Sequence, residues 1–288
     1  SAYRPLAFAY DLKGAEGTLY ISEHADMTDA REFPMPANRT SCSVDNLKTD
    51  TTYYYTVQTE GDVYTGSFQT AQGPRFVKIP GVENTRDIGG YVNLDGKTVR
   101  QGLLIRGTEM DGLVEPGYFM DEAAREDVQE TFGFVYDFDL RSGTLYNGPY
   151  QSRLGEGVGH KFYSAPQYGQ IFMADYQKSV REIFRDLADP EKYPMYLHCT
   201  YGADRTGTVV FLLQGLLNMP QEDMVREFQM TGFHTKAYRK SDKMDVVISG
   251  LANYAGENLQ EQIETYLLTT VGVTREQIAS IREIFLEE

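Results

Sequence analysis

A cysteine and an arginine six residues apart, Cys199 and Arg205, are the pair whose types and spacing could do chemistry in this sequence. They lie in residues 198–207, His-Cys-Thr-Tyr-Gly-Ala-Asp-Arg-Thr-Gly, which follow one apolar stretch and precede another. A short loop between a strand and a helix points successive backbone N–H groups inward, and the positive end of the helix dipole favours an anion there. The segment therefore predicts a cradle for a tetrahedral dianion, with a thiol at its start.

Most residues of this segment have an expected role. The pKa of a thiol falls at a helix N-terminus, so we expect Cys199 to be an ionised nucleophile. Arg205 would curl over the loop and hold two phosphate oxygens with its planar guanidinium. Gly202 would permit the tight turn, Thr206 could donate its hydroxyl to the thiolate, and His198 would orient the loop through its backbone. The other residues of the predicted phosphate-binding segment are Thr200, Tyr201 and Ala203. An inert buried thiol is the alternative reading of the cysteine.

Residues 198–206 resemble the phosphate-binding loop (P-loop) of the protein-tyrosine-phosphatase superfamily, His-Cys-x5-Arg-Ser/Thr. Other segments are similar to ordered landmarks of one bacterial branch of that superfamily, and they are residues 84–91, 102–107, 139–142, 266–268 and 272–274. The resemblance covers about residues 78–288. It implies a secreted phosphatase of a branch that acts on phosphotyrosine, phosphoserine or phosphothreonine and sometimes phosphoinositides.

The reaction needs a general acid to protonate the leaving oxygen. Orthodox tyrosine phosphatases carry it on a Trp-Pro-Asp loop, but this chain has no Trp. The resemblance to the bacterial branch places the acid just before the P-loop arginine, at Asp204. Asp87 and Asp139 are the other candidates, and capping of the following helix is the alternative role of Asp204.

The resemblance places four more charged residues near the pocket: Arg86, Asp87, Asp139 and Arg141. A buried ion-pair network that braces the P-loop and direct contact with substrate are equally open roles for them. One departure concerns Ala203, since phosphoinositide-active relatives commonly carry Lys there. The resemblance therefore implies a weaker affinity for highly phosphorylated headgroups.

The elements that must position these residues alternate between strands and helices, which predicts an α/β domain over residues 81–288 with a central sheet flanked by helices. The expected strands are residues 103–105, 134–138 and 195–198. The expected helices are residues 115–130, 171–188, 206–218, 221–231, 241–269 and 275–287.

A small all-β sandwich is predicted for residues 1–72, followed by a linker at 73–80. Its expected strands are residues 18–22, 39–44, 52–59 and 63–69. Residues 46–57, followed by 67–71, resemble the final strands of fibronectin type III modules. In bacterial enzymes such modules usually imply export, so we expect a secreted or cell-surface protein, with a cytoplasmic location as the alternative.

Composition limits the classes of partner. A net charge of −15 argues against a general nucleic-acid or anionic-membrane surface, and no apolar stretch approaches the length of a membrane span. The few histidines have neither an i,i+4 partner nor a cysteine cluster, so we expect no metal and no cofactor. The charge leaves a local phosphate or sulfate site in the P-loop possible, because backbone N–H groups can build one within an acidic surface.

The residues together predict a hydrolase that acts on a phosphorylated protein or a small phosphomonoester through a phosphocysteine. A phosphotyrosine peptide is the first expected substrate, with dual specificity open. Phosphoinositides and inositol phosphates, as in the cysteine phytases, are the rival substrates. A module that binds phosphorylated ligands without turnover, for adhesion or scaffolding, is the rival of another class.

Overall fold

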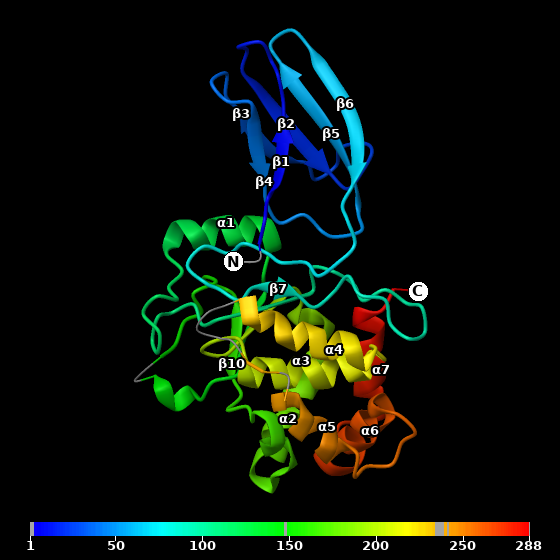
Figure 1. Ribbon diagram of the computed structural model, residues 1–288. Helices are drawn as coiled ribbons and strands as arrows, with labels where there is room; N and C mark the ends of the chain where they lie inside the picture. Colours follow the sequence, from blue (N-terminus) through cyan, green and yellow to red (C-terminus); the bar gives the residue numbers. More distant parts are fainter. Residues whose placement is uncertain (1–2, 147–148, 234–238, 241, 288) are drawn as a thin grey trace. The chain divides into compact units, whose positions relative to one another are not determined.

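The computed structural model describes residues 3–146, 149–233, 239–240 and 242–287 (Figure 1). The chain forms two compact units, residues 2–78 and residues 79–288. The boundary falls inside the segment predicted as a linker, residues 73–80. Within that segment, Arg75 donates to the backbone carbonyls of Asn46 and Leu47, so it is part of the first unit.

The first unit consists of two antiparallel sheets. Its strands are β1 (Leu6–Ala9), β2 (Gly17–Ser22), β3 (Arg31–Met35), β4 (Ser41–Val44), β5 (Thr52–Thr59) and β6 (Val63–Gln69). One sheet pairs β1 with β4, and the other has the order β3-β2-β5-β6. Alternate residues of the central strands, Leu19, Ile21, Tyr53 and Val57, form the core because successive side chains of a strand point to opposite faces.

Two strands of the first unit were not predicted from the sequence. All four residues of β1, Leu-Ala-Phe-Ala, are apolar, so its sequence shows no alternation of apolar and polar side chains. β3 contains Pro34, which cannot donate to a sheet and is tolerated because β3 lies at the edge. The four predicted strands correspond to β2, β4, β5 and β6.

The second unit is built around a sheet with the order β10-β9-β11-β8-β7. Its strands are β7 (Arg86–Asp87), β8 (Leu104–Gly107), β9 (Tyr136–Asp139), β10 (Gly159–Phe162) and β11 (Met195–His198). The four strands β8–β11 are parallel, and β7 runs antiparallel to β8. β8 and β11 are buried along their whole length, as expected for parallel strands covered on both faces.

Helices follow the strands and supply the rest of the core. They are α1 (Glu122–Phe132), α2 (Ala174–Leu187), α3 (Asp204–Leu216), α4 (Gln221–Gln229), α5 (Asp242–Leu251), α6 (Leu259–Tyr266) and α7 (Arg275–Phe285), with short turns η1 (Gly143–Leu145), η2 (Tyr168–Phe172), η3 (Pro190–Lys192), η4 (Met230–Phe233) and η5 (Leu267–Val271). Every residue of α3 from Thr206 onward is buried, and α3 packs against α4 and α6. Figure 1 shows α3 and α4 side by side.

The mixed α/β architecture predicted for this unit is confirmed, with differences at particular elements. The single helix expected over residues 241–269 is wrong, because the chain breaks around Gly256, whose φ of +150° no helix contains. α5 and α6 lie on either side of this break, and Ser241 lies outside the described residues. The helix expected from residue 115 begins instead at Glu122, after the Asp121 side chain caps it through Ala124. β7 and β10 were not predicted.

None of the helices in the described ranges is long and apolar enough to cross a membrane.

Candidate active site

The predicted P-loop connects the end of β11 to the start of α3, so Cys199 directly follows the strand and Arg205 lies in the first turn of the helix. In the parallel part of the sheet, His198 lies opposite Gly107 of β8 and Asp139 of β9. The carboxyl ends of three strands therefore meet around the loop. In open α/β sheets this edge is where ligands bind.

Cys199 is unpaired and only 2% exposed. Burial disfavours its thiolate, but the Arg205 guanidinium and the hydroxyl and backbone N–H of Thr206 outweigh burial, so the pKa of the thiol lies below its ordinary value. The Thr206 hydroxyl is itself buried and makes no hydrogen bond of ordinary geometry within the described structure, so its effect reflects a dipole close to sulfur. The surroundings of this thiol favour ionisation, whereas an inert buried thiol would have a raised pKa.

The loop bends sharply at Gly202, whose φ is +61°. A Cβ atom at this position would lie 2.3 Å from the carbonyl oxygen of Gly107, so only glycine fits. At the loop's start, the backbone N–H of Glu109 donates to the carbonyl of Thr200. Arg205 lies over the same segment, with its Nη2 3.4 Å from the Thr200 hydroxyl oxygen. Gly202 therefore forms the turn of the loop, and the Arg205 side chain folds back toward the loop's start.

Beneath the loop, two buried arginines share one carboxylate. Arg86 Nε donates to Glu227 Oε1 at 2.6 Å, and Arg106 Nη1 donates to Glu227 Oε2 at 2.6 Å. Arg106 Nη2 also donates to the carbonyl of Gly202 at 2.6 Å. Asn84 donates to the carbonyls of Tyr201 and Gly202, and its own side-chain oxygen accepts from Arg86. We call Asn84, Arg86, Arg106 and Glu227 the brace.

The contacts of the brace favour a bracing role for Arg86 over contact with substrate. The Arg86 side chain is 1% exposed, and its described hydrogen bonds go to Asn84, Glu227 and Thr231. A guanidinium committed in this way supports the loop from below. Burial and the neighbouring Arg86 lower the pKa of Arg106 to about 10, so Arg106 stays charged at neutral pH.

Asp87 has a structural role of a similar kind. Its two carboxylate oxygens accept hydrogen bonds from the backbone N–H groups of Gly89 and Gly102, at 2.8 and 2.6 Å. The residue is 1% exposed. Asp87 therefore ties two connecting segments together, and its contacts do not favour it as the general acid.

Beside the loop, Arg141 is fully buried among three carboxylates. It donates to Asp139 and Asp111 at 2.7 and 2.8 Å, to Glu109, and to the Tyr146 hydroxyl. Asp139, the other candidate acid, accepts from Arg141 through both of its oxygens. These contacts place Asp139 and Arg141 in an ion-pair cluster and leave them little capacity to bind substrate.

His198 forms an ion pair with Asp137 that fixes the orientation of its imidazole ring. Nε2 lies 2.8 Å from Asp137 Oδ1, and Nδ1 lies 3.3 Å from the carbonyl oxygen of Cys199. Burial alone would lower the pKa of the ring, but Asp139 and Asp137 outweigh burial and raise it to about 9. The ring is therefore charged at neutral pH, and its Nδ1 contacts the backbone carbonyl at the start of the loop.

Asp204 differs from the other two candidate acids because its side chain is 20% exposed. Arg239 Nε and Nη2 donate to its two oxygens at 2.7 and 2.8 Å, and the Tyr168 hydroxyl donates to Oδ1 at 2.5 Å. Burial would raise the pKa of this carboxyl, but Arg239, Tyr168 and Arg205 together lower it. The helix N-cap position is held by Ala203, so Asp204 is already the first helical residue.

The other loop residues are buried or half-buried. Thr200 is 6% exposed and Ala203 fully buried, whereas Tyr201 is half-buried and stacks edge-on against Tyr118. The predicted site residues did not include several side chains that the fold brings to the loop, among them Asn84, Arg106, Tyr168, Glu227 and Arg239. Asn84 and Arg106 lie in segments that carry the family resemblance, but no local pattern marks the other three.

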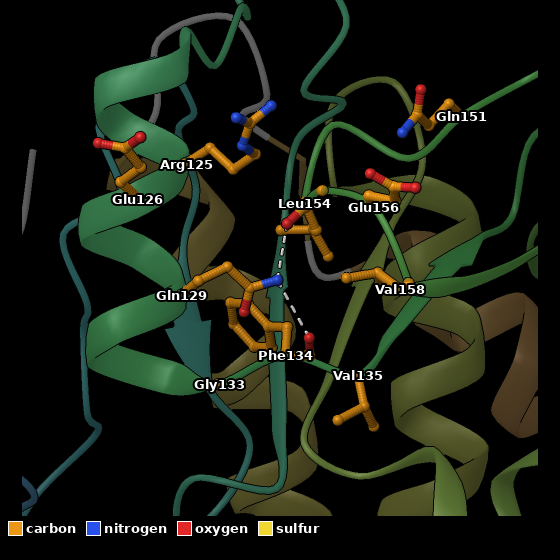
Figure 2. Close-up of a pocket in the computed structure, with 12 residues that line it drawn as sticks. Arg125, Glu126, Gln129, Gly133, Phe134, Val135, Gln151, Leu154, Glu156 and Val158 are labelled. Atoms are coloured by element: carbon orange, nitrogen blue, oxygen red, sulfur yellow. Dashed lines mark hydrogen bonds between the residues drawn. The ribbon is translucent and has the colours of Figure 1, made fainter.

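A cavity of about 620 Å³ lies elsewhere in the second unit, between α1 and residues 151–158 (Figure 2). Gln129 reaches across it and donates to the carbonyls of Phe134 and Leu154. Phe134 and Val135 precede β9, so the cavity lies at the amino end of that strand, whereas the P-loop lies at the carboxyl ends. No described part of the chain brings together three His, Cys, Asp or Glu side chains in a metal-binding group.

A family described as "Tyrosine phosphatase family" matches residues 77–287. A comparison with curated proteins found no match. A similar solved structure is the core catalytic domain of the PP-IP phosphatase SIW14 from S. cerevisiae in complex with citrate. It is 12% identical with a TM-score of 0.36, and the match covers 60% of this chain and 87% of that one. A likeness this low carries no argument about substrate.

Proposed function

Because the chain belongs to the tyrosine phosphatase family, a family of phosphate monoester hydrolases, we propose that it is a protein-tyrosine phosphatase working through a phosphocysteine. The observation that carries this function is the Cys199 thiol, which has a lowered pKa and lies at the start of the loop that Arg205 overhangs. The N-terminus of α3 adds its positive dipole end to the same loop. These features bind a phosphate dianion and supply the nucleophile.

The first step transfers the phosphoryl group to sulfur. The Cys199 thiolate attacks phosphorus, and the bond from phosphorus to the ester oxygen breaks while Asp204 gives that oxygen its proton. Arg205 and the loop N–H groups stabilise the charge on the equatorial oxygens. Of the three candidate acids, Asp204 is the one with a partly exposed carboxyl, which supports its role here.

The second step regenerates the enzyme. Water attacks the phosphocysteine, Asp204 takes the proton from water, and the bond between phosphorus and sulfur breaks to release phosphate and the thiolate. A thiolate stabilised by Thr206 and Arg205 is a good leaving group for this step.

The first unit is proposed as a fibronectin type III-like module of an exported bacterial enzyme. Its strands are antiparallel, and the Tyr53 hydroxyl at the start of β5 accepts from the backbone N–H of Lys48 at 2.8 Å. A tyrosine that bonds back to the chain just upstream in this way is a hallmark of such sandwiches. Antibody detection of the native protein in culture medium and in cell fractions tests export, and a purely cytoplasmic signal would contradict it.

Turnover of 4-nitrophenyl phosphate in EDTA tests the chemistry, and the matched variants are Cys199→Ser and Cys42→Ser. We expect the first to lose activity by at least about 10⁴-fold and the second to retain it, because Cys42 lies in the first unit. Equal rates for wild type and Cys199→Ser would contradict catalysis and favour a module that only binds phosphorylated ligands.

A substrate panel then tests specificity. We expect a phosphotyrosine peptide to have the highest kcat/KM, above phosphoserine peptides, phosphoinositides and inositol hexakisphosphate. Ala203 adds no positive charge to the loop for a second phosphate, which supports this order. A preference for the inositol substrates would establish the rival function while leaving the Cys199 mechanism intact.

A further inference from the structure

The ion pair between Asp204 and Arg239 connects the P-loop to a distant part of the chain. Arg239 is 35 residues from Asp204 in sequence and contacts it through two parallel hydrogen bonds. Both side chains are partly buried, with exposed fractions of 20% for Asp204 and 24% for Arg239. A bidentate guanidinium–carboxylate pair is among the strongest side-chain contacts, and it favours the charged form of both groups.

This ion pair affects the two chemical steps differently. An acid must carry a proton, so a carboxylate held ionised by Arg239 is a poor acid for the first step. A base must be ionised, so the same pair leaves the second step unimpaired. The ion pair should therefore slow the first step most for substrates whose leaving oxygen must be protonated as it departs.

Leaving groups differ greatly in that need. A tyrosine phenol has a pKa of about 10, whereas an aliphatic alcohol is a far weaker acid and its oxygen must be protonated as it departs. We infer that Arg239 is a positioning residue that keeps Asp204 ionised and thereby makes this enzyme selective for aryl over alkyl phosphate esters. This inference depends on the proposed function, because it assumes that Asp204 is the acid.

Tyr168 and Arg205 near Asp204 act in the same direction as Arg239, and the Cys199 thiolate opposes them. Tyr168, in η2, donates to the same carboxylate, and Arg205 follows Asp204 on its own helix. Lys243, in α5, lies 6.0 Å from the centre of the Tyr168 ring. The Cys199 thiolate is a negative group near Asp204, and Asp204 in turn raises the pKa of Cys199. Arg239 is the group with two direct bonds to the carboxylate, so its removal should have the largest effect.

The test compares Arg239→Gln with wild type on phenyl phosphate and on an alkyl ester, phosphoserine. We expect the ratio of kcat/KM, aryl over alkyl, to fall about tenfold, because Asp204 gains a proton more readily. We also expect the basic limb of the pH profile to move up by about one unit. A loss of general phosphate attraction would change both substrates equally and leave the ratio constant.

Matched variants sharpen the test. Arg226→Gln removes an arginine that pairs with Glu222 and Asp223 on α4, and it should change neither the ratio nor the pH limb. Tyr168→Phe should shift both in the same direction as Arg239→Gln, but by less, and Arg239→Lys should restore part of the selectivity. A folded Arg239→Gln protein, judged by circular dichroism, with an unchanged ratio and limb would overturn the inference.

Failure of the proposed function would look different. If Cys199→Ser or Asp204→Asn kept wild-type turnover of the aryl ester with the same leaving-group dependence, the mechanism itself would be wrong. If both lost it and Arg239→Gln behaved as wild type, only the role of Arg239 would be wrong.

Discussion

Two sets of charged side chains meet the same P-loop and differ in burial. In the brace, the side chains of Arg86, Arg106 and Glu227 are at most 2% exposed. The second set, which we call the rim, consists of Asp204, Arg239 and Tyr168. The side chains of Asp204 and Arg239 are 20% and 24% exposed. Both sets contain arginine–carboxylate pairs at about the same distances, so bond length does not distinguish them.

The two sets differ in whether their charged groups can change hydrogen-bond partner or protonation state. A buried carboxylate between two guanidinium groups cannot change partner or protonation without leaving a charge unpaired in the interior, so the brace can only hold shape. A pair in contact with water can open at a modest cost, and a proton can reach it. Burial therefore separates the charges that build the loop from those that can take part in its chemistry.

The largest expected effect comes from breaking the brace. Glu227→Ala removes the carboxylate that Arg86 and Arg106 share, and we expect it to lower the free energy of unfolding by about 3–5 kcal/mol. Urea denaturation measures this loss. The control is Glu222→Ala on the exposed side of the same helix, which should cost no more than about 0.5 kcal/mol. Equal losses in the two variants would contradict the distinction between brace and surface pairs.

A smaller effect should appear in the dependence of stability on pH. The folded protein raises the pKa of His198 to about 9 from an ordinary value of 6.5. The contribution of protonated His198 to the free energy of unfolding is therefore fully present below about pH 6.5 and is lost as pH rises through 9. Its upper limit is about 3 kcal/mol. Urea unfolding at pH 6, 7.5 and 9.5 should show this decline. His198→Gln should flatten it, and an unchanged slope in that variant would assign the decline to other groups.

The turn at Gly202 allows a test of the backbone shape of the P-loop that changes no charged group. Gly202→Ala forces a side chain into a left-handed conformation and against the Gly107 carbonyl, so we expect a loss of about 1–3 kcal/mol in stability. kcat/KM for an aryl phosphate should fall together with stability, because the backbone N–H groups of the loop would no longer point toward the phosphate. Gly117→Ala is the control, since its Cβ would meet only a side-chain atom at 3.9 Å. Full activity in Gly202→Ala would show that the turn tolerates distortion.

The smallest expected effect concerns the nucleophile. The Thr206 hydroxyl and backbone N–H lower the pKa of Cys199, and Thr206→Ala removes only the hydroxyl. Losing one such dipole is worth about 1 kcal/mol, so the acidic limb of kcat/KM should move up by less than one pH unit. Thiol alkylation by iodoacetamide across pH gives an independent titration. A downward shift in both measurements would contradict the role of the hydroxyl.

The sequence predicted the loop itself because its residues are consecutive. Cys199, Gly202, Arg205 and Thr206 act within a single strand–loop–helix segment, so spacing alone relates them. The brace could not be predicted in this way, since Arg86 and Glu227 are 141 residues apart and no local pattern indicates their contact.

The same limit applies to the rim and to the short elements. Tyr168 and Arg239 reach Asp204 from 36 and 35 residues away. β7 contains two residues, too few to show any periodicity. Asp87 and Asp139 have the side-chain type of a general acid, and the fold, not the sequence, shows that both are only 1% exposed, whereas the Asp204 side chain is 20% exposed.

The shared carboxylate of Glu227 also has a consequence for the order in which the molecule is made. A ribosome releases Arg86 and Arg106 long before α4, so a nascent chain lacks the counter-ion that these guanidinium groups need in order to be buried. The Gly202 carbonyl cannot be held by Arg106 in its final place until that helix docks. Catalytic competence should therefore arise late in synthesis, and a chain interrupted before residue 227 should contain every residue of the P-loop and yet hydrolyse nothing.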